Sequence, residues 1–170
     1  MQAEFTMQSI TQKLQRFKDI SAKLTLCGRF DDALKMCAAG IEMMCASPEK
    51  DTPQGAKWLY ALETAKAGAL MAKKDFEGAK NAYAAALEYI AALPRGIEFS
   101  CALDNLAKAF KALGDAQNAL ACRKASLENL EEFDLASKEL VAEKYMLLAG
   151  ELDACGRCAE AIEIRRKIGR

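Results

Sequence analysis

The chain has 170 residues, of which 52% are hydrophobic and 28% charged, and its 24 basic residues balance 24 acidic ones. That length suits one domain with a sizeable core, and the zero net charge excludes bulk attraction to nucleic acid or to an anionic membrane. The chain contains no His, which excludes His-based catalytic triads, His metal sites and His proton shuttles.

Alanine is abundant, Pro contributes only three residues and β-branched residues are sparse. This composition favours helices over a β-sandwich, a collagen-like chain or a disordered one. Hydrophobic residues recur with the period of a helix, and Pro-containing loops at 47–53 and 93–96 interrupt the pattern. The periodicity predicts eight helices, over residues 4–26, 31–46, 54–72, 76–92, 97–112, 116–131, 134–154 and 158–168.

One turn motif recurs four times at intervals of about 40 residues, a period typical of solenoids built from helix pairs. Gly28, Gly114 and Gly156 occupy equivalent positions in three turns, where each is expected to end a helix in the left-handed conformation. Lys74 occupies the fourth position, which predicts a turn that is shaped differently or slightly strained. In the helix after each turn, a small residue is expected to let two helices pack closely; these residues are Ala33, Ala79, Ala119 and Ala161.

The residues around these turns resemble the tetratricopeptide repeat (TPR) family. The match is clearest in the third repeat, at Leu103, Leu106, Ala107, Phe110, Gly114 and Ala119, and in the fourth, at Tyr145, Leu148, Ala149, Leu152, Gly156 and Ala161. It covers nearly the whole chain, and the long period is similar to that of the kinesin-light-chain type. The resemblance implies one all-α domain over residues 1–170, a right-handed superhelical solenoid of four helix-turn-helix repeats, approximately 4–46, 54–92, 97–131 and 134–168.

The resemblance also implies that the first helices of the repeats line a concave face, which holds a peptide or helix of a partner protein. The positions projected onto this face include Lys18, Thr25, Thr64, Met71, Asp104, Asn105, Lys108, Lys111 and Met146. The groove is expected to be basic in the third repeat and acidic in the fourth. Its lysines would meet acidic groups of a partner and Asn105 its backbone; the alternative is that these are ordinary solvated side chains.

Small residues stand at other positions of this predicted face. Ala22 and Gly68 replace the asparagines with which chaperone-tail-binding members of the family clamp a carboxylate, which argues against that specificity. Gly68 and Gly150 would instead leave room for a bulky side chain of the partner or for a helix.

The seven cysteines are odd in number and follow no disulfide framework, which predicts reduced, mostly buried thiols. Only Cys155-Gly-Arg-Cys158 has a spacing that suggests reactive chemistry, as a thiol-redox or metal-responsive regulator. Zinc would need two further ligands without any His, and the position of Cys155 at a helix C-terminus disfavours a thiolate. The plainer interpretation is a turn that contains two cysteines.

Enzyme motifs for nucleotide binding or acyl transfer are absent from the sequence. Most of the acidic residues are expected on solvent faces or in capping positions, such as Asp31, Asp115 and Asp134, so paired catalytic carboxylates have no support. No secretory signal is recognisable, and no apolar run reaches the length of a membrane span. We therefore expect a non-catalytic cytoplasmic protein without a cofactor, whose partners are proteins rather than nucleic acids or membranes.

The last predicted helix raises an alternative, because Ile162, Ile164 and Ile168 spread around it without a polar capping helix beyond. Repeat arrays need their terminal faces shielded. Either a second copy packs on this helix and forms a homodimer, or further sequence covers it. A self-assembly module that uses its terminal helices is therefore a second hypothesis beside the interaction scaffold.

Overall fold

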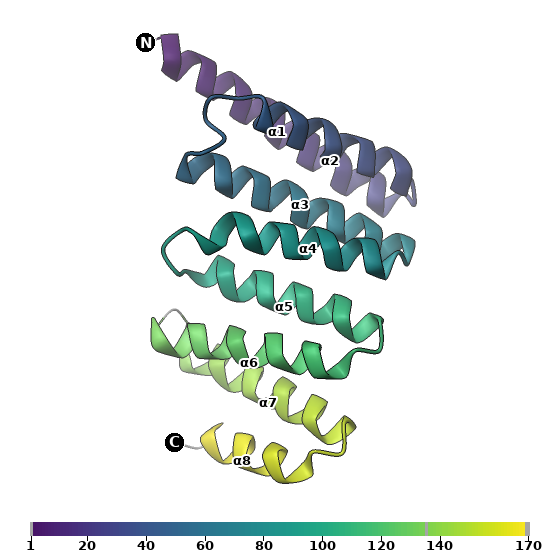
Figure 1. The fold of residues 1–170 in the computed structure, drawn as a ribbon, viewed down its shortest axis with the longest axis vertical. Helices are drawn as coiled ribbons and strands as arrows, with labels where there is room; N and C mark the ends of the chain where they lie inside the picture. Colours follow the sequence, from purple (N-terminus) through teal and green to yellow (C-terminus); the bar gives the residue numbers. More distant parts are fainter. Residues whose placement is uncertain (1, 135, 169–170) are drawn as a thin grey trace. The chain divides into compact units, whose positions relative to one another are not determined.

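The computed structural model describes residues 2–134 and 136–168, with side chains from residue 10 onward. In this part of the chain there are eight helices and no strands, which confirms the all-α prediction (Figure 1). The helices are α1 (Gln2–Leu26), α2 (Phe30–Cys45), α3 (Pro53–Lys73), α4 (Phe76–Ala91), α5 (Ile97–Ala112), α6 (Ala116–Glu132), α7 (Lys138–Ala154) and α8 (Cys158–Ile168).

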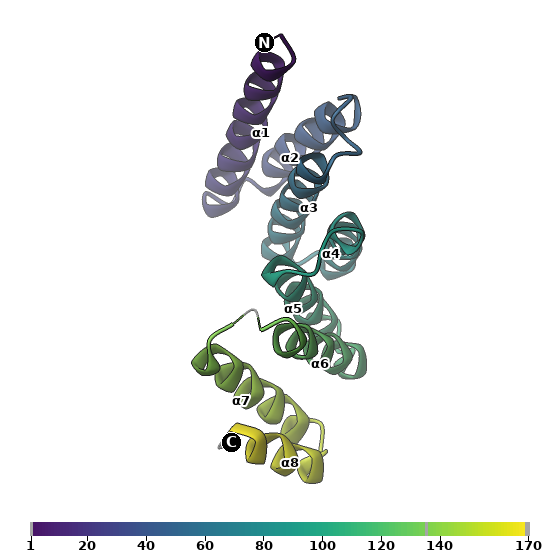
Figure 2. The same ribbon diagram turned by 90° about the vertical axis from the view of Figure 1, so that its left-hand side faces the viewer.

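The chain divides into two compact units, each of which contains two helix pairs. The N-terminal unit spans Met1–Leu93 and the C-terminal unit Pro94–Arg170. In the N-terminal unit, α1 pairs with α2 and α3 with α4, and α3 packs on both α1 and α2. In the C-terminal unit, α5 pairs with α6 and α7 with α8, while α6 packs on α7 (Figure 2). Each pair corresponds to one predicted repeat; a single domain over all 170 residues stays a prediction.

The core of each unit is aliphatic, and the four predicted small residues lie within it. Ala33, Ala79 and Ala161 have no exposed surface, and Ala119 has only 4%. In the C-terminal unit, Ala161 packs in a cluster whose large members include Leu148 and Leu152. A methyl group at these positions lets one helix of a pair approach the other closely.

The four turns between paired helices have the same backbone geometry. Gly28, Gly114 and Gly156 have φ values of 74°, 80° and 73°, and Lys74 adopts 67°. In each turn this residue's amide donates to the carbonyl three positions earlier, and the next amide donates to the carbonyl five positions earlier, at 2.9–3.0 Å. This Schellman arrangement satisfies the last carbonyls of the helix. The expectation of a differently shaped turn at Lys74 is therefore wrong. The other alternative, a slightly strained turn, fits the structure, because Lys74 is a non-glycine residue in the left-handed conformation.

Replacing Lys74 by Gly is expected to raise the free energy of unfolding by about 0.5–1 kcal/mol, because Gly adopts a positive φ without a Cβ clash. Urea denaturation followed by circular dichroism measures the change. Lys74→Ala is the matched control: it also removes the exposed charge but keeps a Cβ, and it should give no such gain. If the two substitutions change the free energy of unfolding equally, the backbone at Lys74 is not strained.

Two predicted caps are wrong, and one is confirmed. α7 begins at Lys138 rather than near Asp134, because the Ser137 hydroxyl caps it by accepting from the Leu140 amide at 3.3 Å. Asp31 lies inside the first turn of α2, where it accepts a hydrogen bond from Lys73 Nζ at 2.7 Å. Asp115 does cap α6, since its Oδ1 accepts from the amide of Asn118 at 3.1 Å. The error at Asp31 arises because an acidic residue near a helix start fits the first turn as well as the cap. Asp134 instead lies in the preceding loop with a φ of 48°.

Candidate functional site

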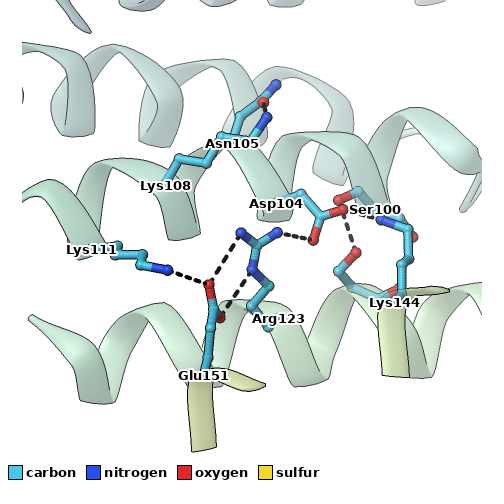
Figure 3. Close-up of polar contacts among 9 residues, drawn as sticks. Ser100, Asp104, Asn105, Lys108, Lys111, Arg123, Lys144 and Glu151 are labelled. Atoms are coloured by element: carbon cyan, nitrogen blue, oxygen red, sulfur yellow. Dashed lines mark hydrogen bonds and ion pairs between the residues drawn. The ribbon is translucent and has the colours of Figure 1, made fainter. Parts of the chain in front are cut away.

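Charged side chains from three helices of the C-terminal unit meet around Arg123 of α6 (Figure 3). Its Nη1 lies 3.3 Å from Asp104 Oδ1 on α5, and its Nε lies 3.2 Å from Glu151 Oε2 on α7. Lys144 of α7 also pairs with Asp104, and Lys111 Nζ of α5 lies 3.2 Å from Glu151 Oε1. We call these five residues the Arg123 network. It joins the first helices of the third and fourth repeats through the helix between them.

The spacing of the charges along α5 and α7 explains why the network forms. Asp104 and Lys111 are seven residues apart on α5, and Lys144 and Glu151 are seven residues apart on α7, so each pair shares one helix face. The order of the charges is reversed between the two helices. Each residue of α5 therefore meets its opposite charge one repeat later, and Arg123 bridges the two carboxylates.

The centre of the network is removed from water. The side chains of Arg123 and Glu151 are each 10% exposed, and that of Asp104 is 14% exposed. Most acidic residues were expected on solvent faces or at caps, and these two are exceptions, as is Glu63 of α3, which is 6% exposed. Charges so far from solvent are tolerated only when they are paired, so the network fixes the rotamers of its members.

Two hollows lie beside the network. The first has a volume of about 460 Å³ and is lined by Asp104, Lys108, Arg123, Leu140, Glu143, Lys144 and Leu147. The second has a volume of about 210 Å³ and is lined by Lys111, Ala116, Ala119, Leu120, Glu151, Ala154 and Cys155. Both run between residues of α5 and α7, and we call the surface that carries them the α5–α7 face. Its walls are aliphatic and ionic.

Of the binding residues that the sequence predicts in the third and fourth repeats, Asp104, Lys108 and Lys111 line the two hollows. Asp104 and Lys111 belong to the network. Lys108 is exposed, and its Nζ donates to Asn105 Oδ1 at 3.0 Å; it forms no ion pair with any residue that the structure describes. Met146 of α7 is 54% exposed. Arg123 was not predicted, because it comes from a second helix of a repeat, and the family's binding positions lie on first helices.

Two of the predicted binding residues of the N-terminal unit, Lys18 and Thr25, have local partners of their own. The ammonium of Lys18 lies 5.8 Å from the centre of the Trp58 ring, within the range of a cation–π contact. Thr25 Oγ1 donates to the Ser21 carbonyl of its own helix at 2.9 Å. Thr64 buries a hydroxyl that has no hydrogen-bond partner in the described structure, and Met71 is half-buried. A role of these residues in binding stays a prediction.

Most of the cysteines are exposed, contrary to the prediction of mostly buried thiols; the exposed ones are Cys27, Cys45, Cys101, Cys155 and Cys158. Cys37 is buried, and its sulfur lies 3.0 Å from the Ser21 hydroxyl. Burial raises the pKa of the Cys37 thiol, which keeps it protonated and unreactive. Cys155 and Cys158 lie in the turn between α7 and α8. Among the side chains that the structure describes, from residue 10 onward, no three His, Cys, Asp or Glu residues cluster so as to hold a metal ion.

No helix in the described residues is both long and apolar enough to cross a lipid bilayer.

No protein-family model matches the chain, and no curated protein matches it at the level of sequence. Solved structures do match. One is BtubC (BKLC) from P. vanneervenii, with a TM-score of 0.75, 15% identity, and coverage of 92% of this chain and 62% of that one.

Two further structures are similar over most of this chain. The apo form of RapI has a TM-score of 0.74 at 13% identity and covers 92% of this chain and 54% of its own. A Podosopora anserina protein with kinesin light chain TPR-like repeats has a TM-score of 0.72 at 16% identity, covering 91% of this chain and 72% of that one. The chain thus spans about three fifths of BtubC and about half of RapI. The fold is that of the TPR-like helical-repeat solenoids, as the turn motif predicted.

Proposed function

We propose that the chain is a non-catalytic scaffold that binds a segment of a partner protein on the α5–α7 face. The observation that carries the proposal is the first hollow, where the ammonium of Lys108, free of ion pairs in the described structure, lines the same space as Leu147. TPR-like solenoids use the first helices of their repeats as a binding wall, and α5 and α7 are such helices. Protein binding through this wall is the function that the fold and the face both support.

Exposed apolar side chains give the α5–α7 face the means to bury surface against a partner. Leu147, which lines the first hollow, is 44% exposed. Large apolar groups beside a polar rim are typical of protein interfaces. The Arg123 network lies between the two hollows and holds their charged walls in fixed positions, so a partner meets a face that is already ordered.

The charge of the face favours a partner that carries carboxylates. The two hollows together are lined by four cations and three carboxylates, and the network neutralises most of them internally; the cations are Lys108, Lys111, Arg123 and Lys144. Lys108 forms no ion pair in the described structure, although Asp104 and Glu143 line the same hollow. An acidic group of the partner beside Lys108 would raise both the rate of encounter and the specificity.

Charge reversal at Lys108 tests the proposal. Lys108→Glu is expected to weaken the complex with a partner isolated from the native lysate about tenfold or more, because an attractive contact becomes repulsive. Lys57→Glu, which reverses an exposed lysine of α3 in the other unit, is the matched control and should leave the affinity unchanged. Lys111→Glu is a poorer probe because it also breaks the contact with Glu151. Equal affinity of Lys108→Glu and the wild type would contradict binding at this face.

A second candidate function is self-assembly through α8, and the exposed Ile162 favours it. This side chain is 49% exposed, and the helix ends in the basic residues Arg165, Arg166 and Lys167. A homodimer through this helix would cover Ile162. Light scattering distinguishes the two functions, because only self-assembly predicts a dimer of the isolated chain. For both candidate functions we propose a cytoplasmic location, because the seven cysteines follow no disulfide framework.

A further inference from the structure

The α7–α8 pair is attached to its unit by less apolar packing than the α3–α4 pair is to the other unit. In the N-terminal unit, α3 packs on both α1 and α2, and one cluster of buried residues joins the three helices through Leu14, Met44 and Leu62. In the C-terminal unit, α7 packs on α6, and its buried cluster includes Leu120 and Leu127 of α6 but no residue of α5. The two hollows lie between α5 and α7, whereas α1 and α3 pack on each other directly.

Ion pairs provide the contacts between the two helix pairs that apolar packing does not. Those that cross from the α5–α6 pair to the α7–α8 pair are Arg123–Glu151, Lys111–Glu151, Lys144–Asp104 and Lys124–Glu160. Figure 3 shows the three that involve Glu151 or Asp104. In the N-terminal unit, as far as the structure describes it, a single ion pair, Lys73–Asp31, crosses between the helix pairs. The attachment of α7–α8 is thus ionic at α5 and mixed at α6.

An ionic attachment opens more easily than an apolar one. When the helix pairs separate, each charged group regains its hydration, whereas apolar surface loses free energy on contact with water. Salt weakens the exposed contacts further, and Lys111 is 64% exposed while Lys124 and Glu160 are 37% and 43% exposed. The α7–α8 pair keeps its own core on separation, since Leu152 packs in one cluster with Ala161 of α8. The pair can therefore open as a unit.

We propose that the α7–α8 pair opens from the α5–α6 pair as one cooperative unit, and that this opening dismantles the α5–α7 face. The first hollow takes Asp104 and Lys108 from one side of the opening and Glu143 and Leu147 from the other. A partner that contacts both sides binds only the closed arrangement, so its apparent affinity falls with the closed fraction. Ionic strength shifts the balance toward the open arrangement. This inference rests on the proposed function and adds a mechanism for its regulation.

Hydrogen–deuterium exchange of the intact chain, followed by mass spectrometry of peptic fragments, measures the opening. Amides in α7 and α8 are expected to exchange about tenfold faster than those in α5 and α6, through one shared opening. Raising NaCl from about 0.05 M to about 0.5 M should accelerate this exchange about threefold, because salt screens the exposed charges. Exchange in α3 and α4 should not respond to salt.

Two variants assign the opening to the ion pairs. Arg123→Met should accelerate exchange in α7 and α8 alone by about a further tenfold, because Glu151 loses its most buried cation. The matched control is Lys73→Met, which breaks the single cross-pair contact of the other unit and should leave exchange in α3 and α4 within about twofold of the wild type. If Arg123→Met accelerates exchange along the whole chain, Lys124→Met replaces it, since that variant breaks only the exposed pair with Glu160.

In the complex with a partner isolated from the native lysate, exchange of α7 and α8 should slow about tenfold, because the partner binds the closed arrangement. Unchanged exchange in the complex would overturn the regulatory part of the inference. Equal exchange of the two helix pairs, or exchange of α7 and α8 that does not respond to salt, would overturn the opening itself. The proposed function would then stand, because Lys108→Glu tests it separately. A salt-dependent opening with full affinity of Lys108→Glu would instead overturn the proposed function, and with it the regulation.

Discussion

The Arg123→Met variant is expected to lose about 2–3 kcal/mol of unfolding free energy, because Asp104 and Glu151 lose the cation they share and keep only Lys144 and Lys111. Arg123 is bonded to Asp104 and to Glu151, and each of the three side chains is at least 86% buried. Methionine fills a similar volume, so the loss reflects charge rather than a cavity. Urea denaturation measures it, and the transition should also broaden if α7 and α8 detach first.

An exposed pair provides the control for this variant. Arg157 and Glu160 are 2.6 Å apart with side chains 40% and 43% exposed, and Arg157→Met is expected to change stability by less than about 1 kcal/mol. Arg123→Lys should fall between the two, because a lysine keeps the charge but not the planar fork that reaches both carboxylates. If Arg123→Met costs no more than Arg157→Met, the network does not hold α7 on the α5–α6 pair.

The Gly55→Ala variant is expected to lose about 2–3 kcal/mol, because its methyl group would overlap the preceding loop. A Cβ on Gly55 would lie 2.1 Å from the Glu49 carbonyl oxygen and 2.8 Å from that of Lys50. These are backbone atoms, so relief requires the loop to move away from α3. That movement would also disturb Thr52, whose hydroxyl caps α3 by accepting from the Gly55 amide at 3.0 Å.

Gly68→Ala is the matched substitution for Gly55→Ala, since both sites lie in α3. A Cβ at Gly68 meets no atom within 4 Å, so the better helix propensity of alanine should raise the free energy of unfolding by about 0.5–1 kcal/mol. Opposite signs for the two substitutions, measured by thermal denaturation, are the expected result. A loss of stability in both variants would show that contact with the loop is not what requires Gly55.

The helices of this chain could be predicted from the sequence because their signals are local. Apolar periodicity places the helices, and Gly28, Gly114 and Gly156 mark the left-handed ends of three of them. Lys74 adopts the same conformation without any local preference for it, since tertiary packing of α3 against α4 decides that turn. The start of α7 was misplaced for a related reason: the cap depends on whether Ser137 or Asp134 adopts an extended backbone.

The candidate site could be predicted only in part. The family resemblance placed Asp104, Lys108 and Lys111 on one face of α5, but it treated them as free to meet a partner. A further signal is present in the sequence, because opposite charges stand one repeat apart at Asp104 and Lys144 and again at Lys111 and Glu151. Arg123 carries no such signal. Its role depends on how α6 lies between α5 and α7, which only the three-dimensional structure shows.

The exposure of the cysteines could not be predicted from the sequence either. A thiol in an apolar sequence context predicts burial, yet Cys27, in the turn after α1, and Cys101 of α5 are exposed. Helical phase, rather than composition, decides which face a residue occupies. Cys37 is buried since its helical phase directs it toward Ser21 of α1.

Site-specific photo-crosslinking tests the central claim, that a partner binds on the α5–α7 face, most directly. The photoreactive amino acid p-benzoylphenylalanine is placed at Leu147, and in separate variants at Ile162 of α8 and Leu26 of α1, which are also exposed. After irradiation in the native lysate, the account predicts a discrete heterologous adduct at position 147 that Lys108→Glu abolishes, and none at 162 or 26. Adducts confined to position 162, with the mass of two copies of this chain, would contradict it.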